Sequence, residues 1–241
     1  MIFVQNNSID AAYHFSVEEF FLRHVQKDAP VLMIWQSDKT VMLGSNQVAE
    51  AEINLEYAKE SNISIVRRQS GGGAIFTDLG TVLYTCIEPL KKEAIEHREA
   101  LAEQVIRALQ KIGVTAAREG KNDILIDGKK ISGLAQFNTA THVCTHGSLL
   151  YDTDLEVLSG VLIADESKLS PKGISSIRSR VTNIKPYMKV QNNVAEFINE
   201  MKNNILNNNE YEAYYISDDE YKMIDEIHRT KYLSPEWTFR M

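Results

Sequence analysis

The chain has 241 residues, of which 44% are hydrophobic and 24% are charged, and its formal net charge is −7. This composition supports one sizeable hydrophobic core and excludes a disordered or low-complexity protein. The acidic balance argues against nucleic acid as a partner, because binding to a phosphate backbone requires an excess of lysine and arginine. Uncharged apolar runs such as Val31–Trp35 are far shorter than the roughly 20 residues of a membrane-spanning helix, so we expect no membrane segment.

The N-terminal sequence and the two cysteines indicate the same cellular compartment. Residues 1–10 mix apolar and polar side chains and have no basic segment ahead of an apolar one, so we expect no secretion signal. Cys86 and Cys144 lie far apart and provide no disulfide framework. A reducing, cytoplasmic location is therefore expected.

The first half of the chain predicts an N-terminal helix followed by short strands. Apolar residues at helical spacing across Ser8–Val25 predict an amphipathic helix with Ser8 or Asp10 as its cap. Val31–Trp35 and Val41–Leu43 are apolar runs that predict two strands separated by a turn. Further elements are expected at Asn54–Glu60 (helix), Ile63–Arg67 (strand), Thr81–Ile87 (strand) and Lys91–Ile112 (helix).

The second half begins with a hairpin. Asp127 and Gly128 form a turn signal between the strand patterns of Asp123–Asp127 and Lys129–Phe137. A strand at Cys144–Tyr151 and helices near Asp154–Leu158, Val194–Leu206 and Asp218–Arg229 complete the prediction. Strands and helices mixed with hairpins favour an α/β or α+β fold, with a mainly antiparallel sheet flanked by helices, over a doubly wound fold. We find no repeat or linker and expect one domain over residues 1–241.

Three consecutive glycines, Gly71, Gly72 and Gly73, follow a predicted strand and two arginines, Arg67 and Arg68. Because glycine has no side chain, its backbone N–H group can approach a phosphate or carboxylate closely. A guanidinium adds positive charge and planar hydrogen-bond donors. This pattern indicates either an anion-binding loop or a glycine-rich turn with surface arginines. The glycine trio lacks the glycine spacing of a dinucleotide-binding fingerprint. The segment Gly113–Asn122 lacks both the spacing and the terminal Ser or Thr of a P-loop.

The hairpin carries a second candidate group. Lys129 and Lys130 are adjacent on a predicted strand, so their side chains point to opposite faces and one of them faces the covered side of a regular sheet. An inward lysine requires an anionic partner. The alternative is that both lysines are solvated hairpin residues, since lysine is rarely buried without a partner.

His142, Cys144 and His146 alternate on a predicted strand and so share one face. Residues four apart on a strand are roughly 13 Å apart, too far for all three to ligate one ion with bonds near 2 Å. We therefore expect no zinc site, and satisfied polar or core residues instead.

Five segments, in order along the chain, carry a resemblance to a known family. They are Arg67–Gly80 (RRQSGGGAIFTDLG), Asn122–Ile124, Gly128–Gly133 (GKKISG), His146–Leu150 and Lys172–Asn183 (KGISSIRSRVTN). With these segments the chain resembles the lipoate–protein ligases of the A type. The resemblance implies a biotinyl/lipoyl ligase-type catalytic domain that forms lipoyl-AMP from lipoate and ATP, and then transfers the lipoyl group to a lysine of a carrier protein.

The resemblance also implies roles for particular residues. Lys130 would be the central catalytic cation, Trp35 would line the apolar lipoyl tunnel, and Asn122 and Asp123 would flank the nucleotide, with Asp123 near a Mg²⁺ ion. The remaining implied substrate- and nucleotide-binding residues are Arg68, Ser70, Gly71, Gly72, Gly73, Ala74, Ile75, Phe76, Ser132, His146 and Gly147. Lys172–Asn183 would form an adenylate-binding loop that closes over the nucleotide and excludes water.

Ligases of this type usually continue into a small C-terminal domain, whereas Pro235–Met241 reaches that junction and stops. We therefore expect either an autonomous ligase or a transfer-only enzyme that uses lipoyl-AMP or a separate accessory subunit. A related octanoyl- or lipoyl-transferase with a cysteine thioester, and a non-catalytic lipoyl-binding or carrier-docking protein, are the competing hypotheses. The expected carrier is an E2 lipoyl domain of a 2-oxoacid dehydrogenase or the glycine cleavage H protein.

Overall fold

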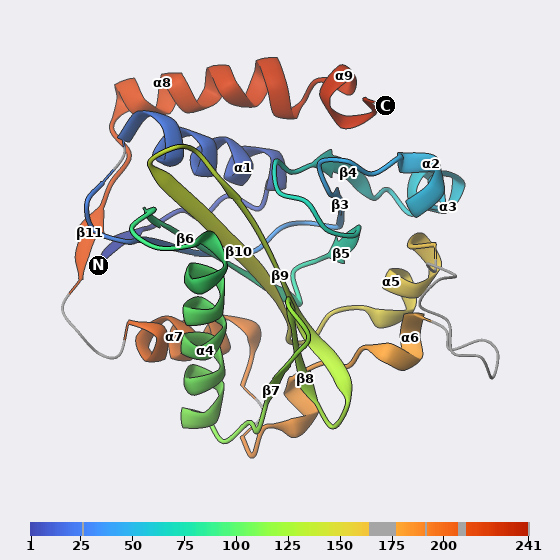
Figure 1. Ribbon diagram of the computed structural model, residues 1–241. Helices are drawn as coiled ribbons and strands as arrows, with labels where there is room; N and C mark the ends of the chain where they lie inside the picture. The colour runs from blue at the N-terminus through green and yellow to red at the C-terminus, as the bar shows by residue number, and fades with distance from the viewer. Residues whose placement is uncertain (26, 164–176, 191, 207–210, 241) are drawn as a thin grey trace.

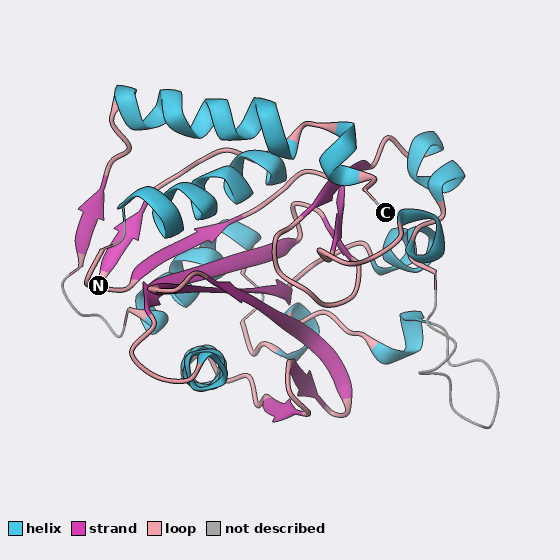
Figure 2. Cartoon of the chain, turned by 45° about the horizontal axis from the view of Figure 1, so that its top comes forward, coloured by secondary structure: helices cyan, strands magenta, loops and turns pink. Residues whose placement is uncertain are grey.

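Two β-sheets form the centre of the molecule (Figures 1 and 2). The computed structural model describes residues 1–25, 27–163, 177–190, 192–206 and 211–240. Within these residues the larger sheet has eight strands, in the spatial order β11 (Glu212–Tyr214), β1 (Ile2–Val4), β2 (Val31–Trp35), β6 (Thr81–Pro89), β10 (His142–Leu150), β9 (Lys129–Asn138), β8 (Asp123–Ile126) and β7 (Ala117–Glu119). The smaller sheet has the order β4 (Ser64–Arg67), β3 (Thr40–Leu43) and β5 (Ile75–Thr77).

Most neighbouring strands are antiparallel. The exceptions in the described residues are β1, which pairs in parallel with β2 and β11, and the parallel pair β3–β4. The expected mixed fold with a mainly antiparallel sheet is therefore confirmed.

Helices cover both faces of the larger sheet (Figures 1 and 2). One face packs against α1 (Ala11–Phe20) and α8 (Asp218–Ile227), and the other against α4 (Ala94–Lys111) and α7 (Val194–Ile205). The other helical segments are η1 (Phe21–Val25), α2 (Ala49–Glu52), α3 (Leu55–Glu60), α5 (Leu155–Val161), α6 (Ile177–Arg180), η3 (Lys185–Tyr187), η4 (His228–Tyr232) and α9 (Pro235–Thr238).

Strand β6 explains how one sheet supports two cores. Its side chains alternate, so Val82 and Tyr84 join the core beneath α4, while Leu83 and Ile87 join the core beneath α1. A strand buried on both faces reads as a continuous apolar run in the sequence. A third core joins the smaller sheet to α3 and α5.

Local sequence signals fix several boundaries as expected. Asp10 caps α1, since its carboxylate accepts hydrogen bonds from the N–H groups of Ala12 and Tyr13. Asp127 (φ 48°) and Gly128 (φ 73°) both adopt the left-handed conformation, which a two-residue hairpin turn of type I′ requires. The predicted hairpin between β8 and β9 is therefore confirmed.

Two features differ from the simplest interpretation of the sequence or lie outside it. β2 and β3 are consecutive in the chain but belong to different sheets, so their connection crosses between the sheets rather than closing a hairpin. Of the predicted adenylate-binding loop, residues 172–176 lie outside the described residues, while Ile177–Arg180 forms α6 and Val181 bridges to Lys130 of β9. None of the helices in the described parts of the chain has the length and apolar character needed to cross a membrane.

Candidate functional site

A cavity of about 770 Å³ lies between the two sheets, and residues of both sheets line it. Strand register shows how it crosses the larger sheet. Trp35, Leu83, Ser148, Gly133 and Asp123 are successive cross-strand partners on β2, β6, β10, β9 and β8, and all five line the cavity. Four steps between strands about 4.8 Å apart make this row roughly 19 Å long. The cavity is therefore an extended channel, apolar at Trp35 and charged at Asp123.

The apolar part of the cavity is built from the protein core. Trp35 is 4% exposed, and its indole N–H donates to the Thr85 hydroxyl at 3.1 Å. One face of the indole stacks on His14 at a centroid distance of 4.2 Å, and Phe15 meets it edge-on at 5.9 Å. Three neighbours thus fix the ring, which gives this part of the channel a rigid wall.

The charged part contains Lys130 and Asp123. The Lys130 ammonium lies 2.9 Å from a carboxylate oxygen of Asp123, and the two side chains are 38% and 41% exposed. Lys130 lines the cavity together with Asn122, whereas Lys129 is exposed and does not line it. The two lysines therefore differ as expected: Lys130 faces the cavity and has an anionic partner, although its side chain keeps partial contact with solvent, and Lys129 is solvated.

Arg68 holds the glycine loop, residues 68–74, in shape. Its guanidinium donates to the carbonyl oxygens of Met42, Gly71 and Gly73, each at 2.8 Å. Gly72 adopts a φ of 94°, which a side chain would strain. Arg68 is 4% exposed, and burial lowers its pKa to about 10 while Glu18 acts in the opposite sense. The surface-arginine alternative is therefore wrong: both Arg67 and Arg68 are buried.

A buried hydrogen-bond chain runs from this loop to helix α1. Arg68 Nε donates to Ser70 Oγ at 3.0 Å, and Ser70 Oγ lies 2.7 Å from His146 Nε2. His146 Nδ1 lies 3.0 Å from both carboxylate oxygens of Glu18. Glu18 also accepts a bond from the Thr85 hydroxyl at 2.6 Å, the same hydroxyl that accepts from the Trp35 indole. The wall of the apolar part and the glycine loop thus belong to one network.

The comparisons with known proteins agree with this geometry. The family described as the lipoyl protein ligase A/B catalytic domain matches residues 10–206. The chain belongs to this family. Lipoate-protein ligase LplJ of Bacillus subtilis is 32% identical over 243 residues, a match that spans 99% of this chain and 73% of that protein.

Solved structures of this family share the fold. A chain from an archaeal lipoylation system, a bi-partite lipoate protein ligase with its E2 lipoyl domain from Thermoplasma acidophilum, superposes with a TM-score of 0.87 at 27% identity. The alignment covers 98% of this chain and 95% of that chain. A lipoate-protein ligase A bound with ATP gives a TM-score of 0.85 at 25% identity, over 99% and 97% of the two chains.

The residues that the family resemblance singled out converge on the cavity. Of the individually named residues, all line it except Ser70 and Gly71, and Ser179, Arg180 and Val181 of the predicted adenylate-binding loop line it as well. Ser70 lies behind the wall and joins Arg68 to His146, and Gly71 contributes its carbonyl oxygen to Arg68. The roles of these residues in binding and catalysis stay predictions.

Ser132 and Gly147 both lie against the hydroxyl end of Tyr84. Ser132 Oγ lies 3.1 Å from the Tyr84 hydroxyl oxygen. A Cβ atom at position 147 would lie 2.3 Å from the same oxygen, so a glycine there leaves room for Tyr84. Burial raises the pKa of Tyr84, so this hydroxyl is neutral and braces the cavity wall.

Sequence analysis missed Glu18. It is 1% exposed and lies within the buried stripe Ala11, Phe15, Glu18 and Leu22 of the N-terminal helix. Those positions follow a heptad-like spacing, so a carboxylate among apolar residues on the core side was the available signal. A buried charge requires partners, and His146 and Thr85 supply them here.

Glu18 also lies beside Cys144 and His146, two of the three β10 residues considered for a zinc site. Ligand atoms of Glu18, Cys144 and His146 lie within 4.8 Å of one another, while His142 is turned to the backbone carbonyl of Lys27. Burial, and then the nearby Glu18, raises the pKa of the Cys144 thiol far above its usual value. Glu18, Cys144 and His146 thus form a buried polar cluster in which the Glu18 carboxylate bonds to His146 and the Cys144 thiol is protonated.

Proposed function

We propose that this chain is a lipoate–protein ligase that activates lipoate with ATP and transfers the lipoyl group to a lysine of a lipoyl carrier protein. The observation that supports this most strongly is the channel, whose apolar wall at Trp35 leads across about 19 Å to Asp123, the ion-pair partner of Lys130. An acyl chain with a charged head group has this shape and polarity. The named relatives and the ATP-bound neighbour support the same activity.

The chemistry requires positive charge at one end of the channel. In the first step a lipoate carboxylate oxygen attacks the α-phosphorus of ATP, and pyrophosphate leaves with the electrons of the broken P–O bond. In the second step a carrier lysine amine attacks the acyl carbon, AMP leaves, and the amine loses a proton. Negative charge grows on phosphate oxygens in the first step and on the acyl oxygen in the second. We propose that Lys130 stabilises both.

The remaining residues are assigned by what they touch. Trp35 would contact the lipoyl chain, and the N–H groups of the glycine loop would contact the adenylate phosphate. Asp123 fits a Mg²⁺ neighbour, since Mg²⁺ takes one or two carboxylates together with substrate phosphates, and Asp123 is half-exposed beside the cavity. When bound, Mg²⁺ neutralises phosphate charge.

The cysteine-dependent alternative lacks support. A thioester enzyme needs a nucleophilic thiolate within reach of the acyl group. Cys86 and Cys144 are buried, burial raises the pKa of both thiols, and neither lines the cavity. A non-catalytic carrier-binding protein would have no need of an inward lysine at the charged end.

The carrier we propose is an E2 lipoyl domain, since a structural neighbour comes from a lipoylation system with that domain. The decisive experiment supplies the pure chain and this carrier with either lipoate and Mg-ATP or synthetic lipoyl-AMP, and follows the carrier mass. Lipoylation from both sources identifies a complete ligase. Lipoylation from lipoyl-AMP alone identifies a transfer-only enzyme.

The residue-level test of this proposal is Lys130→Ala. Removing a preorganised charge of this kind costs on the order of 10²–10³ in rate, and Lys130 is exposed enough that the fold stays intact. Lys129→Ala is the matched control, because this neighbour on the same strand points away from the cavity and should retain the wild-type rate. A Lys130→Ala variant that lipoylates the carrier at the wild-type rate removes Lys130 from the mechanism.

A further inference from the structure

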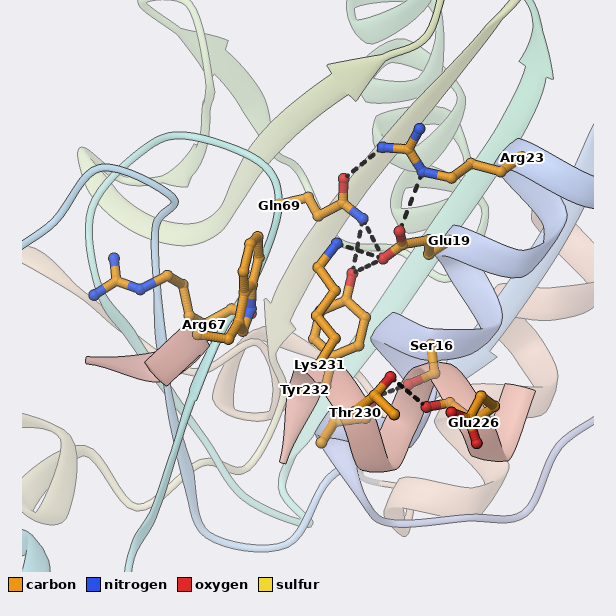
Figure 3. Close-up of polar contacts among 11 residues, drawn as sticks. Ser16, Glu19, Arg23, Arg67, Gln69, Glu226, Thr230, Lys231 and Tyr232 are labelled. Carbon is orange, nitrogen blue, oxygen red and sulfur yellow. Dashed lines mark hydrogen bonds and ion pairs between the residues drawn. The ribbon is translucent and has the colours of Figure 1, made fainter. Parts of the chain in front are cut away.

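The glycine loop is held from two sides, and its entry segment Arg67–Ser70 shows how. β4 ends at Arg67, and the following residues continue the alternation of a strand. Arg68 and Ser70 turn toward the cavity wall and His146. Gln69 turns toward Glu19 of α1 and Tyr232, whereas the Arg67 guanidinium points away from α1 and donates to the carbonyl of Thr238 in the C-terminal segment, residues 228–240 (Figure 3).

Gln69 enters a dense polar cluster on this outer side (Figure 3). Its amide nitrogen donates to the Glu19 carboxylate and to the Tyr232 hydroxyl, the latter at 3.0 Å. Glu19 is 9% exposed and also accepts bonds from Tyr232 at 2.9 Å, Lys231 at 2.7 Å and Arg23 at 3.1 Å. The Gln69 carbonyl faces the Arg23 guanidinium at 3.4 Å. We call Glu19, Gln69, Lys231 and Tyr232 the outer cluster.

Arg67 ties the same segment to the end of the chain. Its Nε donates to the carbonyl of Thr238 at 2.8 Å, and another nitrogen donates to the carbonyls of Gly44 and Gln47 at 2.8 and 2.7 Å. In return the Trp237 indole donates to the Arg67 carbonyl at 2.8 Å. Both odd-numbered residues that lead into the glycine loop are therefore bonded to the C-terminal segment.

Helix α1 connects the two sides through consecutive carboxylates. Glu18 serves the inner side through His146 and Ser70, and Glu19 serves the outer side through Gln69. Glycine-rich backbone has the largest conformational freedom to lose, so a loop of three glycines needs external bonds to hold one shape before a ligand arrives. A loop held in advance does not lose affinity to ordering when the ligand binds.

We infer that Glu19, Gln69 and Tyr232 are positioning residues, which hold the glycine loop in its adenylate-binding shape from the side facing away from the cavity. This inference rests on the proposed function, because it assigns the loop to the adenylate. None of the three residues lines the cavity, so each acts through the loop backbone.

The test uses Gln69→Leu, Tyr232→Phe and the double variant in the full chain, with synthetic lipoyl-AMP and an E2 lipoyl domain. Each single variant should raise the KM for lipoyl-AMP about five- to tenfold, the equivalent of one net hydrogen bond, with kcat nearly unchanged. The double variant should raise it by less than the product of the two, because the two side chains share a bond. Tyr221→Phe is the matched control, the same substitution at a half-exposed position of α8, and should leave the KM unchanged.

A second readout needs no activity. Hydrogen exchange of the Gly71–Gly73 amides in the ligand-free protein should be faster in Gln69→Leu and Tyr232→Phe than in the wild type and in Tyr221→Phe. Faster unfolding alone, with unchanged exchange of these amides and an unchanged KM, overturns the inference and leaves a purely structural cluster. A wild-type chain that lipoylates no carrier from either source removes the proposed function, whereas the exchange result still decides whether the outer cluster holds the loop.

Discussion

The two parts of the channel are built in opposite ways. At the apolar part Trp35 and Leu83 are each 4% exposed and Phe15 is 2% exposed, so the wall of the channel is also the wall of the hydrophobic core. At the charged part the side chains of Lys130 and Asp123 are 38% and 41% exposed. The first part owes its shape to packing, and the second keeps its groups accessible for reaction.

This difference separates stability from activity along one cavity. A substitution in the apolar part removes core contacts and therefore costs free energy of unfolding as well as substrate affinity. A substitution at the charged part removes a group with one ion-pair partner at the surface, and such pairs contribute little to stability. The predictions below test this separation.

The largest stability effect is expected for Trp35→Ala. The indole is almost fully buried and has His14 and Phe15 against its ring, so its removal should lower the free energy of unfolding by about 3–5 kcal/mol. Urea unfolding followed by circular dichroism measures this. Leu79→Ala is the control, since Leu79 is half exposed and its loss should stay within about 0.5 kcal/mol. Equal losses for the two variants would contradict a core-built wall.

A smaller effect concerns pH and His14, which stacks on Trp35. Burial lowers the pKa of His14 to about 4 from its ordinary value of 6.5, so the folded protein holds the ring neutral. The unfolded chain binds a proton below pH 6.5 and the folded chain does not until about pH 4. His14 therefore reduces stability as the pH falls through this window, by about 2 kcal/mol at pH 5 relative to pH 8.

The measurement compares wild type with His14→Phe, which keeps an aromatic ring against Trp35. At each pH the free energy of unfolding of the wild type is subtracted from that of the variant, which removes the contribution of all other titrating groups. The free energy of unfolding of the variant should rise relative to that of the wild type as the pH falls from 6.5 to 5. If the two free energies instead changed in parallel with pH, His14 would have its ordinary pKa in the folded state.

The sequence predicted the parts of this site that depend on neighbours in the chain. The Asp127-Gly128 turn, the Asp10 cap and the opposite directions of Lys129 and Lys130 are all local consequences of backbone geometry. Each was confirmed because nothing distant in the fold competes with it.

What the sequence could not predict depends on pairing between distant segments. The row from Trp35 to Asp123 exists only once the register of five strands is set, and register is a property of the folded sheet. The same holds for Arg68: its donors bond to the carbonyls of Met42, Gly71 and Gly73, so it shapes the glycine loop. From its residue type alone, the guanidinium of Arg68 was expected to bind an anionic ligand directly.

The smallest predicted effect isolates the charged part of the channel, through Gly133→Ala. A Cβ atom at Gly133 would lie 2.9 Å from the Lys130 ammonium and 3.0 Å from the carbon next to it, and both atoms belong to the mobile end of a long side chain. The Lys130 side chain can therefore move aside at little cost in stability, but its ammonium is then displaced from the charged part of the channel. We expect kcat/KM for lipoyl transfer to fall about tenfold, because the charge is displaced rather than removed, while the urea midpoint stays at the wild-type value. A variant with wild-type kcat/KM would show that the position of the ammonium is not critical, and one that unfolds at lower urea would show that stability and activity are not separable at this end.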